Sequence, residues 1–361
     1  MKFEEIFSSI GEALTQESVE RRKFLKSAFI GGASLLSSPF LSKLMAEETG
    51  WRIVRSQIKS RVSMVTHPNA MHSVRSVNAR VMKRLFETAL KMAMNTDNVN
   101  DAWKKVFPQY RAGQVIAFKL TCLNPHNSSH KELVYEIANS LIRWGVKPND
   151  IILFERSAWE LQRQRYRLNW KQNGQIRCFG TSNPGYNPGH DGSFTIPLRD
   201  GLFIGTPHFS KVLTQMCDYI INVPVLKNHS DAGVTLALKN HYGSFNNPSA
   251  YHDDYCDPYI ARLNAHPTIK DKTKLVVLDA LACTYKGGPG GFPNELTKSV
   301  LVSSDPVAID TVGLLMLEDM RRKKGLSSIM NRSKHVATSA EMKLGTNNPE
   351  QITLVKEKIA D

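Results

Sequence analysis

The sequence predicts an α/β fold with a mostly parallel sheet sandwiched by helices. Short runs of apolar and β-branched residues alternate with amphipathic helical patterns along most of the chain. The clearest unit is a strand over Val115–Leu120, a helix over Lys131–Trp144 that Gly145 closes, and a second strand over Ile151–Phe154. A β-α-β unit with so short a connection from the helix to the second strand implies parallel pairing and a right-handed crossover.

Later segments extend this pattern. Further strands are expected at Tyr219–Val225, Leu275–Leu278 and Val300–Val302. A strong helix is expected over residues 306–320, because Asp305 suits the N-cap and proline suits the first helical position. Strands that alternate with helices in this way are typical of an α/β sandwich.

Two segments depart from the alternation. Residues 47–110 are predicted to form a helical lead-in, since apolar residues recur at helical spacing over Ser76–Met94 and again over Asp101–Phe107. The α/β domain is then assigned to residues 111–361. Within it, residues 167–210 are rich in Gly, Pro and Asn turn formers, which predicts a long excursion over the edge of the sheet.

Residues 1–46 resemble a twin-arginine export signal. The pair Arg21–Arg22 precedes Ser27–Ser42, a charge-free run of 16 weakly apolar residues. One basic turn of an ordinary helix is the alternative, and a membrane span would need about 20 strongly apolar residues. Ala46 suits cleavage but Leu44 does not, so an uncleaved N-terminal anchor stays open. The sequence therefore predicts a periplasmic protein that the twin-arginine translocase exports folded.

The net charge and the cysteine content limit which ligands, partners and metal sites are expected. The chain carries +14, and its first 46 residues hold six Lys or Arg and five Glu, so about +13 remains in the rest. This balance predicts a small anionic ligand or substrate, acidic lipid headgroups or an acidic redox partner, while export and the scattered charge argue against nucleic acid. The five cysteines lie 27 to 56 residues apart without a C-x-x-C pair, so neither an iron–sulfur cluster nor a zinc ribbon is expected.

The densest polar signal is a repeated Lys-Asn-His triplet. The first triplet follows a buried-type strand and consists of Lys227, Asn228 and His229. A helix begins near Thr235 and repeats the triplet as Lys239, Asn240 and His241. Ligands of open α/β sheets collect outside the carboxyl ends of strands. Two lysines suit an anion, and neutral histidines suit a metal or acid–base work. The alternative is a set of solvated side chains at helix ends.

Two further loops are predicted at strand ends. One begins with Asp279 and continues into the glycine-rich run 286–291, which lacks the spacing of a phosphate-binding loop. The other contains Asp305, a helix cap, and Asp310 one turn later. Asp310 either faces the site or favours the helix dipole.

These motifs together resemble the domain of unknown function 362 family, in its branch with twin-arginine signals. The resemblance covers roughly Val77 to the C-terminus, and it rests on Lys227-x-His229, Gly233-x-Thr235, Lys239-Asn240-x-x-Gly243, Leu278-Asp279-Ala280, Gly288-Pro289 and Ser304-Asp305-Pro306-x-Ala308-x-Asp310, with Lys119 in the opening strand. Many members are described as iron–sulfur proteins and carry ferredoxin-type cysteines, which this chain lacks. The resemblance implies a fold, a compartment and the positions of the family's motifs, but it does not imply a reaction.

Two hypotheses follow. In the first, an exported enzyme uses a metal ion or an anionic cofactor, and its catalytic residues are Lys227, His229, Lys239, Asn240 and His241. Its metal ligands would be His229, His241, Asp279 and Asp310, and its cofactor-binding residues Lys119, Thr235, Gly288 and Gly290. In the second, a non-catalytic periplasmic protein binds an anion or assists assembly of a redox enzyme. Both predict one cleft that gathers Lys119, Lys227, His229, Lys239, Asp279 and Asp310.

Overall fold

A computed structural model describes residues 51–74, 76–182, 185–193, 195–198 and 207–360. The export signal predicted over residues 1–46 lies outside the described residues. None of the described helices is long and apolar enough to cross a membrane.

The described chain is built around one ten-stranded sheet, with strand order β12-β1-β11-β10-β7-β4-β5-β6, β8 beside β10 and β9 beside β8. Its strands are β1 Ser60–Thr66, β4 Ile116–Lys119, β5 Ile151–Ser157, β6 Arg177–Ser182, β7 Tyr219–Asn222, β8 Val225–His229, β9 Gly233–Val234, β10 Thr273–Thr284, β11 Ser299–Ser303 and β12 Ile352–Lys358. The run from β10 through β7, β4 and β5 to β6 is parallel throughout, which confirms the predicted mostly parallel sheet. A small separate ribbon pairs β2 Met71–Ser73 with β3 Ser76–Val77.

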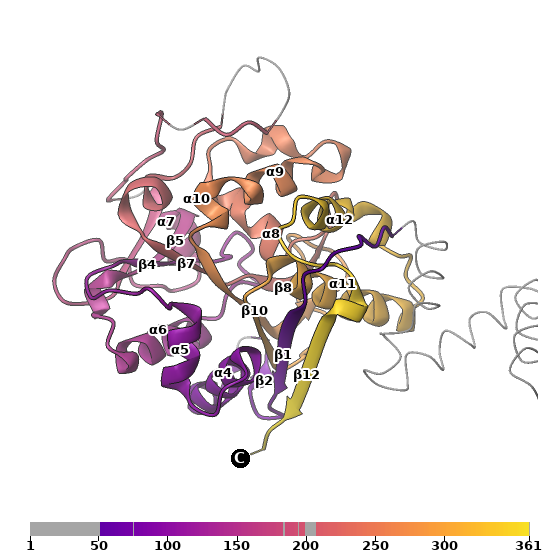
Figure 1. Cartoon of the computed structure of the whole chain (residues 1–361), viewed down its shortest axis with the longest axis horizontal. Helices are drawn as coiled ribbons and strands as arrows, with labels where there is room; N and C mark the ends of the chain where they lie inside the picture. Colours follow the sequence, from indigo (N-terminus) through magenta and orange to yellow (C-terminus); the bar gives the residue numbers. More distant parts are fainter. Residues whose placement is uncertain (1–50, 75, 183–184, 194, 199–206, 361) are drawn as a thin grey trace, which may run out of the picture.

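Helices cover both faces of the sheet (Figure 1). The helices α4, α5 and α6 pack on one face, and α8 to α12 pack on the other; the bounds are α4 Ala79–Met94, α5 Val99–Val106, α6 Lys131–Trp144, α7 Ala158–Arg163, α8 Leu236–Asn240, α9 Tyr259–Ala265, α10 Pro267–Lys270, α11 Pro306–Lys323 and α12 Lys334–Glu341. Alternate residues of β10 enter the two cores, with Val276 and Leu278 on one side and Val277 and Leu281 on the other. The sandwich predicted from the sequence is confirmed.

Local signals fixed the ends of several helices. The Asp305 carboxylate accepts hydrogen bonds from the N–H groups of Val307 and Ala308, both at 2.8 Å, so it caps α11 as predicted. Gly145 ends α6 with a φ of 116°, a left-handed conformation that suits glycine.

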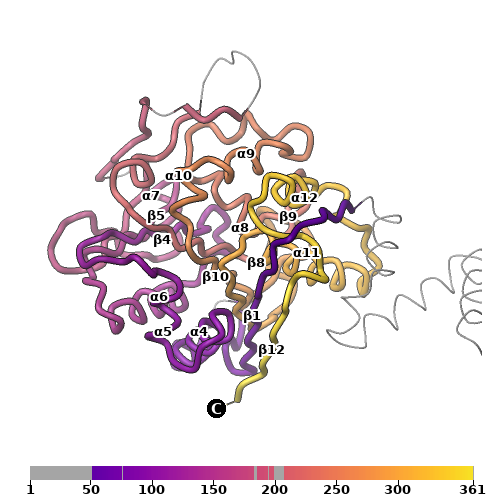
Figure 2. The backbone as a smooth tube through the Cα atoms, in the orientation of Figure 1, coloured from indigo at the N-terminus to yellow at the C-terminus, as the bar shows by residue number. Residues whose placement is uncertain are grey.

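The predicted helical lead-in, residues 47–110, needs correction. It contains α4 and α5, but also β1, which lies between β12 and β11 in the sheet. Figure 2 shows this N-terminal strand running beside the C-terminal β12. A seven-residue strand whose partners lie more than 230 residues away leaves little local signal, because pairing rather than periodicity stabilises it.

Two other segments differ from their predicted form. The excursion predicted over residues 167–210 includes β6, which adds a parallel edge strand to β5. The strand predicted over Tyr219–Val225 is interrupted at Pro224, so that β7 ends and β8 begins as a separate strand beside β10. Proline lacks the N–H group that a continuous central strand needs. The break places the residues of β8 beyond the carboxyl end of β7.

Candidate functional site

A cleft of about 310 Å³ lies at the carboxyl ends of β4, β5 and β8. We call it the lysine cleft; its walls are Thr121, Leu123, Glu155, Arg156, Glu160, Lys227, His229, Ser230, Asp231, Thr235, Lys239, Asn240, Tyr242, Gly243, Pro248, Ser249, His252 and Pro289. It contains four of the five predicted catalytic residues and Thr235. Its position agrees with the rule that open α/β sheets bind ligands at the carboxyl ends of their strands.

Lys227 and His229 reach the cleft because they alternate along β8, while Asn228 between them points elsewhere. Lys227 is 1% exposed, and its ammonium makes no hydrogen bond within the described chain. The Nδ1 atom of His229 accepts the N–H groups of Asp231 at 3.1 Å and Ala232 at 3.3 Å. A neutral ring held in this way carries its proton on Nε2, which is therefore a hydrogen-bond donor.

Lys239 is oriented by His252, a residue that was not predicted from the sequence. The Nδ1 atom of His252 lies 3.0 Å from the carbonyl oxygen of Pro248, which can only accept, so Nδ1 donates. Its Nε2 then accepts from the Lys239 ammonium at 3.0 Å. The same ammonium lies 4.1 Å from the centre of the Tyr242 ring, a cation–π contact. Lys239 thus meets two uncharged partners.

Burial shifts the pKa values of these groups toward their neutral forms. Desolvation lowers the pKa of Lys227 to about 8, and Lys239 adds to the effect. Desolvation likewise lowers the pKa of Lys239 to about 8. The pKa of His229 falls to about 2 through desolvation and the charge of Lys239, so this ring is neutral at physiological pH. The lysines are therefore mostly charged at pH 7 and mostly neutral at pH 9.

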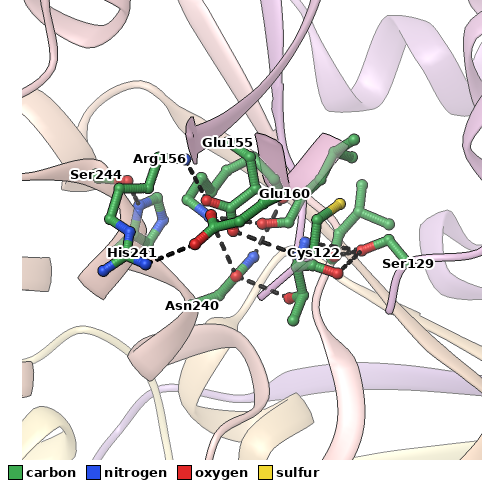
Figure 3. A network of polar contacts seen from close by, with 12 residues as sticks. Cys122, Ser129, Glu155, Arg156, Glu160, Asn240, His241 and Ser244 are labelled. Carbon is green, nitrogen blue, oxygen red and sulfur yellow. Dashed lines mark hydrogen bonds and ion pairs between the residues drawn. The ribbon is translucent and has the colours of Figure 1, made fainter. Parts of the chain in front are cut away.

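The opposite wall is acidic, and its charges are paired. Glu155 binds the Lys119 ammonium at 2.9 Å, and Glu160 binds Arg156 at 2.5 Å. Desolvation followed by the charge of Glu155 raises the pKa of Glu160, whose buried Oε2 atom has no partner in the described chain. Figure 3 shows Glu155, Arg156 and Glu160 gathered beside Asn240. Glu155 lies near the carboxyl end of β5 and Glu160 on α7 directly after it, so their position at a strand end was the available sequence signal.

Lys119 and Asn240 support the cleft from beneath. Lys119 is fully buried, and besides Glu155 it contacts the Asn240 side-chain oxygen at 3.3 Å. Asn240 also accepts from the Thr121 hydroxyl at 2.8 Å and donates to Asn222 at 2.7 Å. These bonds satisfy the amide of Asn240. Lys119, predicted to bind a cofactor, is thus half of a buried ion pair, and Asn240 joins two strands to α8.

His241, Gly288 and Gly290 are among the predicted site residues that lie outside the cleft. His241 is fully buried, with its Nδ1 atom 3.0 Å from the Ser244 hydroxyl, because its side chain leaves the chain on a different side from that of Lys239. Gly288 packs against Asn228, where an added Cβ would lie 2.0 Å from the carbonyl oxygen. Gly290 has no neighbour within 4 Å of such a Cβ. The glycine-rich loop therefore packs on β8, and only Pro289 contributes to the cleft.

The two predicted aspartates belong to other parts of the structure. Asp310 accepts the N–H groups of Ala237 at 2.7 Å and Leu238 at 2.9 Å, so it caps the start of α8. Asp279 shares the sheet face of Val277 and Leu281 and binds His130, at the start of α6, through both its backbone N–H at 2.7 Å and its Nδ1 at 2.9 Å. The prediction that Asp279 and Asp310 join His229 in one cleft is therefore wrong. Strand alternation sends Asp279 to the opposite face.

The predicted metal set of His229, His241, Asp279 and Asp310 is accordingly not brought together. A different trio within the described chain, His229, Asp231 and His252, has ligand atoms within 4.8 Å of one another. The geometry disfavours a metal there, because backbone N–H groups already occupy Nδ1 of His229 and Lys239 occupies Nε2 of His252. Asp231 and His252 lie in turns without a periodic sequence signal.

Comparison with known proteins identifies the family of the region that carries the cleft. The family described as "Domain of unknown function (DUF362)" matches residues 116–314, which is more than half of the chain. The chain belongs to this family. No curated protein matches it. A crystal structure of a protein from Thermotoga maritima is similar over 73% of this chain and 59% of its own length, with 11% identity and a TM-score of 0.31. The chain thus spans less than two thirds of that protein.

The DUF362 match begins with β4 and ends within α11. It therefore contains every residue of the lysine cleft, together with Asp279 and Asp310. The helices α4 and α5 and the strands β1 and β12 lie outside the matched residues but complete the sheet and one of its faces.

Proposed function

We propose that this DUF362 protein is exported and binds a small oxyanion-bearing ligand, such as a carboxylate or phosphate compound, in the lysine cleft. Unpartnered buried polar atoms carry the proposal. The Thr235 hydroxyl and Glu160 Oε2 are buried without a hydrogen-bond partner in the described chain, and Lys227, which is 1% exposed, lines the same cleft. Buried polar groups are nearly always hydrogen-bonded, so a bound ligand accounts for several at once.

The balance of charge favours an anion. Lys119 pairs with Glu155 and Arg156 pairs with Glu160, so Lys227 and Lys239 add two further positive charges against Asp231 at the rim; Glu155 also favours the charged form of Lys227. The side chain of Asp231 is 48% exposed, so solvent screens its charge. His229 adds an N–H donor rather than a charge. Two ammoniums and a neutral donor in a desolvated cleft suit a carboxylate or phosphate group.

The same groups can transfer protons to or from a bound ligand. A lysine whose pKa is about 8 can give or take a proton near neutral pH. Our preferred function is therefore that of an enzyme that transfers protons to or from an anionic substrate. The alternative is a non-catalytic periplasmic protein that binds an anion or assists assembly of a redox enzyme. Release of an unchanged anion on denaturing natively exported protein would favour the alternative.

Sulfate titration tests the binding site, because sulfate keeps its charge over the relevant pH range. Binding is followed through backbone amide signals of Lys227 and His229, which report on this cleft alone. Lys227→Met keeps the buried aliphatic stem but removes the charge, so we expect at least about a tenfold loss of affinity. The control is Lys83→Met, at an exposed lysine on α4. Equal affinity in both variants would overturn the proposal.

A metal centre at His229, Asp231 and His252 is the second candidate, since these side chains lie within ligand distance of one another. Elemental analysis after incubation with Zn²⁺ separates the two functions. We expect less than stoichiometric zinc in the native protein. One zinc per chain, lost in His252→Ala but kept in His126→Ala, would establish the metal centre instead.

The export proposal is supported by Arg21–Arg22 and the weakly apolar run after them. The translocase reads the arginine pair rather than generic charge, so changing both residues to lysine should leave the protein in the cytoplasm. Cell fractionation of this variant beside the native chain measures the effect. Undiminished export would remove the periplasmic assignment.

A further inference from the structure

A second cavity, of about 410 Å³, opens at the N-terminus of α6. We call it the α6 cavity; it is lined by Val74, Val77, Pro125, His126, Ser128, Ser129, His130, Lys131, Glu132, Arg163, Gln164, Arg165 and Phe292. It shares no lining residue with the lysine cleft. The α6 side of the sheet also carries Asp279, a family motif residue that lies outside the lysine cleft.

The floor of the α6 cavity presents hydrogen-bond donors. The helix α6 has 14 residues, and no side chain caps its first turn, although Lys131 and Glu132 of that turn line the cavity. Uncapped N–H groups at the positive end of a helix attract anions. Ser128 lies just before them; it is 8% exposed, and its hydroxyl has no partner in the described chain. An unpartnered hydroxyl on a nearly buried residue that lines the cavity is a second and independent sign of a ligand.

Asp279 fixes the orientation of His130 at the same point. Its carboxylate accepts from the His130 backbone and from Nδ1, and it is itself completely buried. The ring of His130 is therefore held by one nitrogen, and its Nε2 atom has no partner within the described residues. Nδ1 donates to this carboxylate, so Nε2 of the neutral ring could only accept. Burial lowers the pKa of His130, but Asp279 raises it above its ordinary value, which favours the protonated ring, whose Nε2 donates to an anion.

The rim adds positive charge and a flat apolar surface. Lys131, Arg163 and Arg165 line the cavity against a single carboxylate, that of Glu132. Phe292 stacks on His126 with ring centres 3.8 Å apart and an interplanar angle of 27°. Phe292 is also 60% exposed, so its ring is accessible to a further planar group.

We propose that the α6 cavity binds a phosphorylated small molecule that carries a planar ring, such as a nucleoside monophosphate. The phosphate lies at the start of α6, where the helix N–H groups, the Ser128 hydroxyl and His130 Nε2 meet it. The basic side chains at the rim neutralise its charge, and the planar ring stacks on Phe292. This site is independent of ligand binding in the lysine cleft.

The test titrates the full chain with adenosine monophosphate and, separately, with inorganic phosphate. Backbone amide signals of Lys131 and Glu132 report on the α6 cavity, and those of Lys227 and His229 report on the lysine cleft. We expect the α6 signals to shift with both compounds, with adenosine monophosphate binding about tenfold more tightly because its base stacks. Shifts at the lysine cleft alone, or equal affinity for the two compounds, would overturn the proposal.

Two variants sharpen the test without disturbing the fold. Ser128→Ala removes a hydroxyl that bonds to nothing in the described chain, so we expect unchanged thermal unfolding and about tenfold weaker binding of both compounds. Phe292→Ala should weaken only adenosine monophosphate. Ser327→Ala, at an exposed serine outside both cavities, is the control. Native affinity in Ser128→Ala would contradict the phosphate position, and native affinity in Phe292→Ala would contradict the stacked ring.

Discussion

The lysine cleft and the α6 cavity are both cationic, but they hold their charge differently. In the lysine cleft the two ammoniums are buried, with Lys227 1% and Lys239 5% exposed. In the α6 cavity, Arg163 and Arg165 are exposed and Lys131 is half-buried. Burial makes the charge of an ammonium costly and hence sensitive to pH, whereas exposed charges are sensitive mainly to salt. Similar residue types therefore give two sites with different physical behaviour.

Two loops connect these regions. The segment after β4 contributes Thr121 to the lysine cleft and Ser128 to the α6 cavity, and the glycine-rich loop contributes Pro289 to one and Phe292 to the other. Asn124 joins the loops by donating to the carbonyl oxygens of Pro289 at 2.9 Å and Gly291 at 2.8 Å. The two sites therefore share a wall of backbone while they face opposite sides of the sheet.

The largest expected effect comes from the ion pair beneath the lysine cleft. Lys119→Met would leave the Glu155 carboxylate buried without its partner, so the free energy of unfolding should fall by about 3–5 kcal/mol. Lys104→Met removes the same charge from an exposed pair with Asp101 and should change little. Denaturant unfolding of both variants measures the difference. Equal stability would mean that the pair does not hold the cleft together.

A substitution at Gly243 tests how closely this ion pair packs against the wall of the cleft. A Cβ at this position would lie 2.7 Å from the Lys119 nitrogen and 2.9 Å from Glu155 Oε2. We expect Gly243→Ala to lower the free energy of unfolding by about 1–3 kcal/mol. Gly290→Ala is the matched change, because nothing lies within 4 Å of its Cβ, and it should stay within about 0.5 kcal/mol. Thermal unfolding that shows the same shift in both variants would exclude the close fit.

The pH dependence of sulfate binding should separate the two cavities. Lys227 and Lys239 lose their protons as the pH rises through about 8, so affinity at the lysine cleft should fall about tenfold or more between pH 7 and pH 9. Binding at the α6 cavity should fall less, because arginine side chains and backbone N–H groups do not titrate in this range, even though the His130 ring, whose pKa Asp279 raises against the effect of burial, can lose its Nε2 proton. Amide shifts at each site, measured at both pH values, provide the comparison. A cleft affinity that stays constant to pH 9 would show that neither lysine binds the anion.

The smallest expected effect concerns the histidines of the repeated triplet. His229→Ala removes one neutral donor from the lysine cleft, which should weaken sulfate binding by about 0.5–1.5 kcal/mol. His241→Ala should leave binding unchanged, since His241 contacts Ser244 outside the cleft. Calorimetric titration of the two variants measures the difference. Weaker binding in His241→Ala alone would reverse the assignment of the two triplets.

Much of the fold was predictable because its signals are local. The β4-α6-β5 unit, Gly145 at the end of α6 and Asp305 at the start of α11 were each predicted from adjacent residues. β1 and β12 were not, because their stability comes from pairing across most of the chain. Among the candidate site residues, Lys227, His229 and Lys239 were found because a polar triplet after a buried strand is itself a local pattern.

The sequence by itself determined the parallel α/β sheet, the basic character of the molecule and the segment that carries the lysine cleft. Only the tertiary structure decided which residues of that segment face the cleft. In the folded chain His241 is buried in the core, Asp310 caps the start of α8, and Asp279 binds His130 on the other face of the sheet. It also brought in His252 and Glu160, which no spacing linked to the lysines. The reason is geometric: alternation along a strand and rotation about a helix separate neighbours in sequence, while packing joins residues from distant elements.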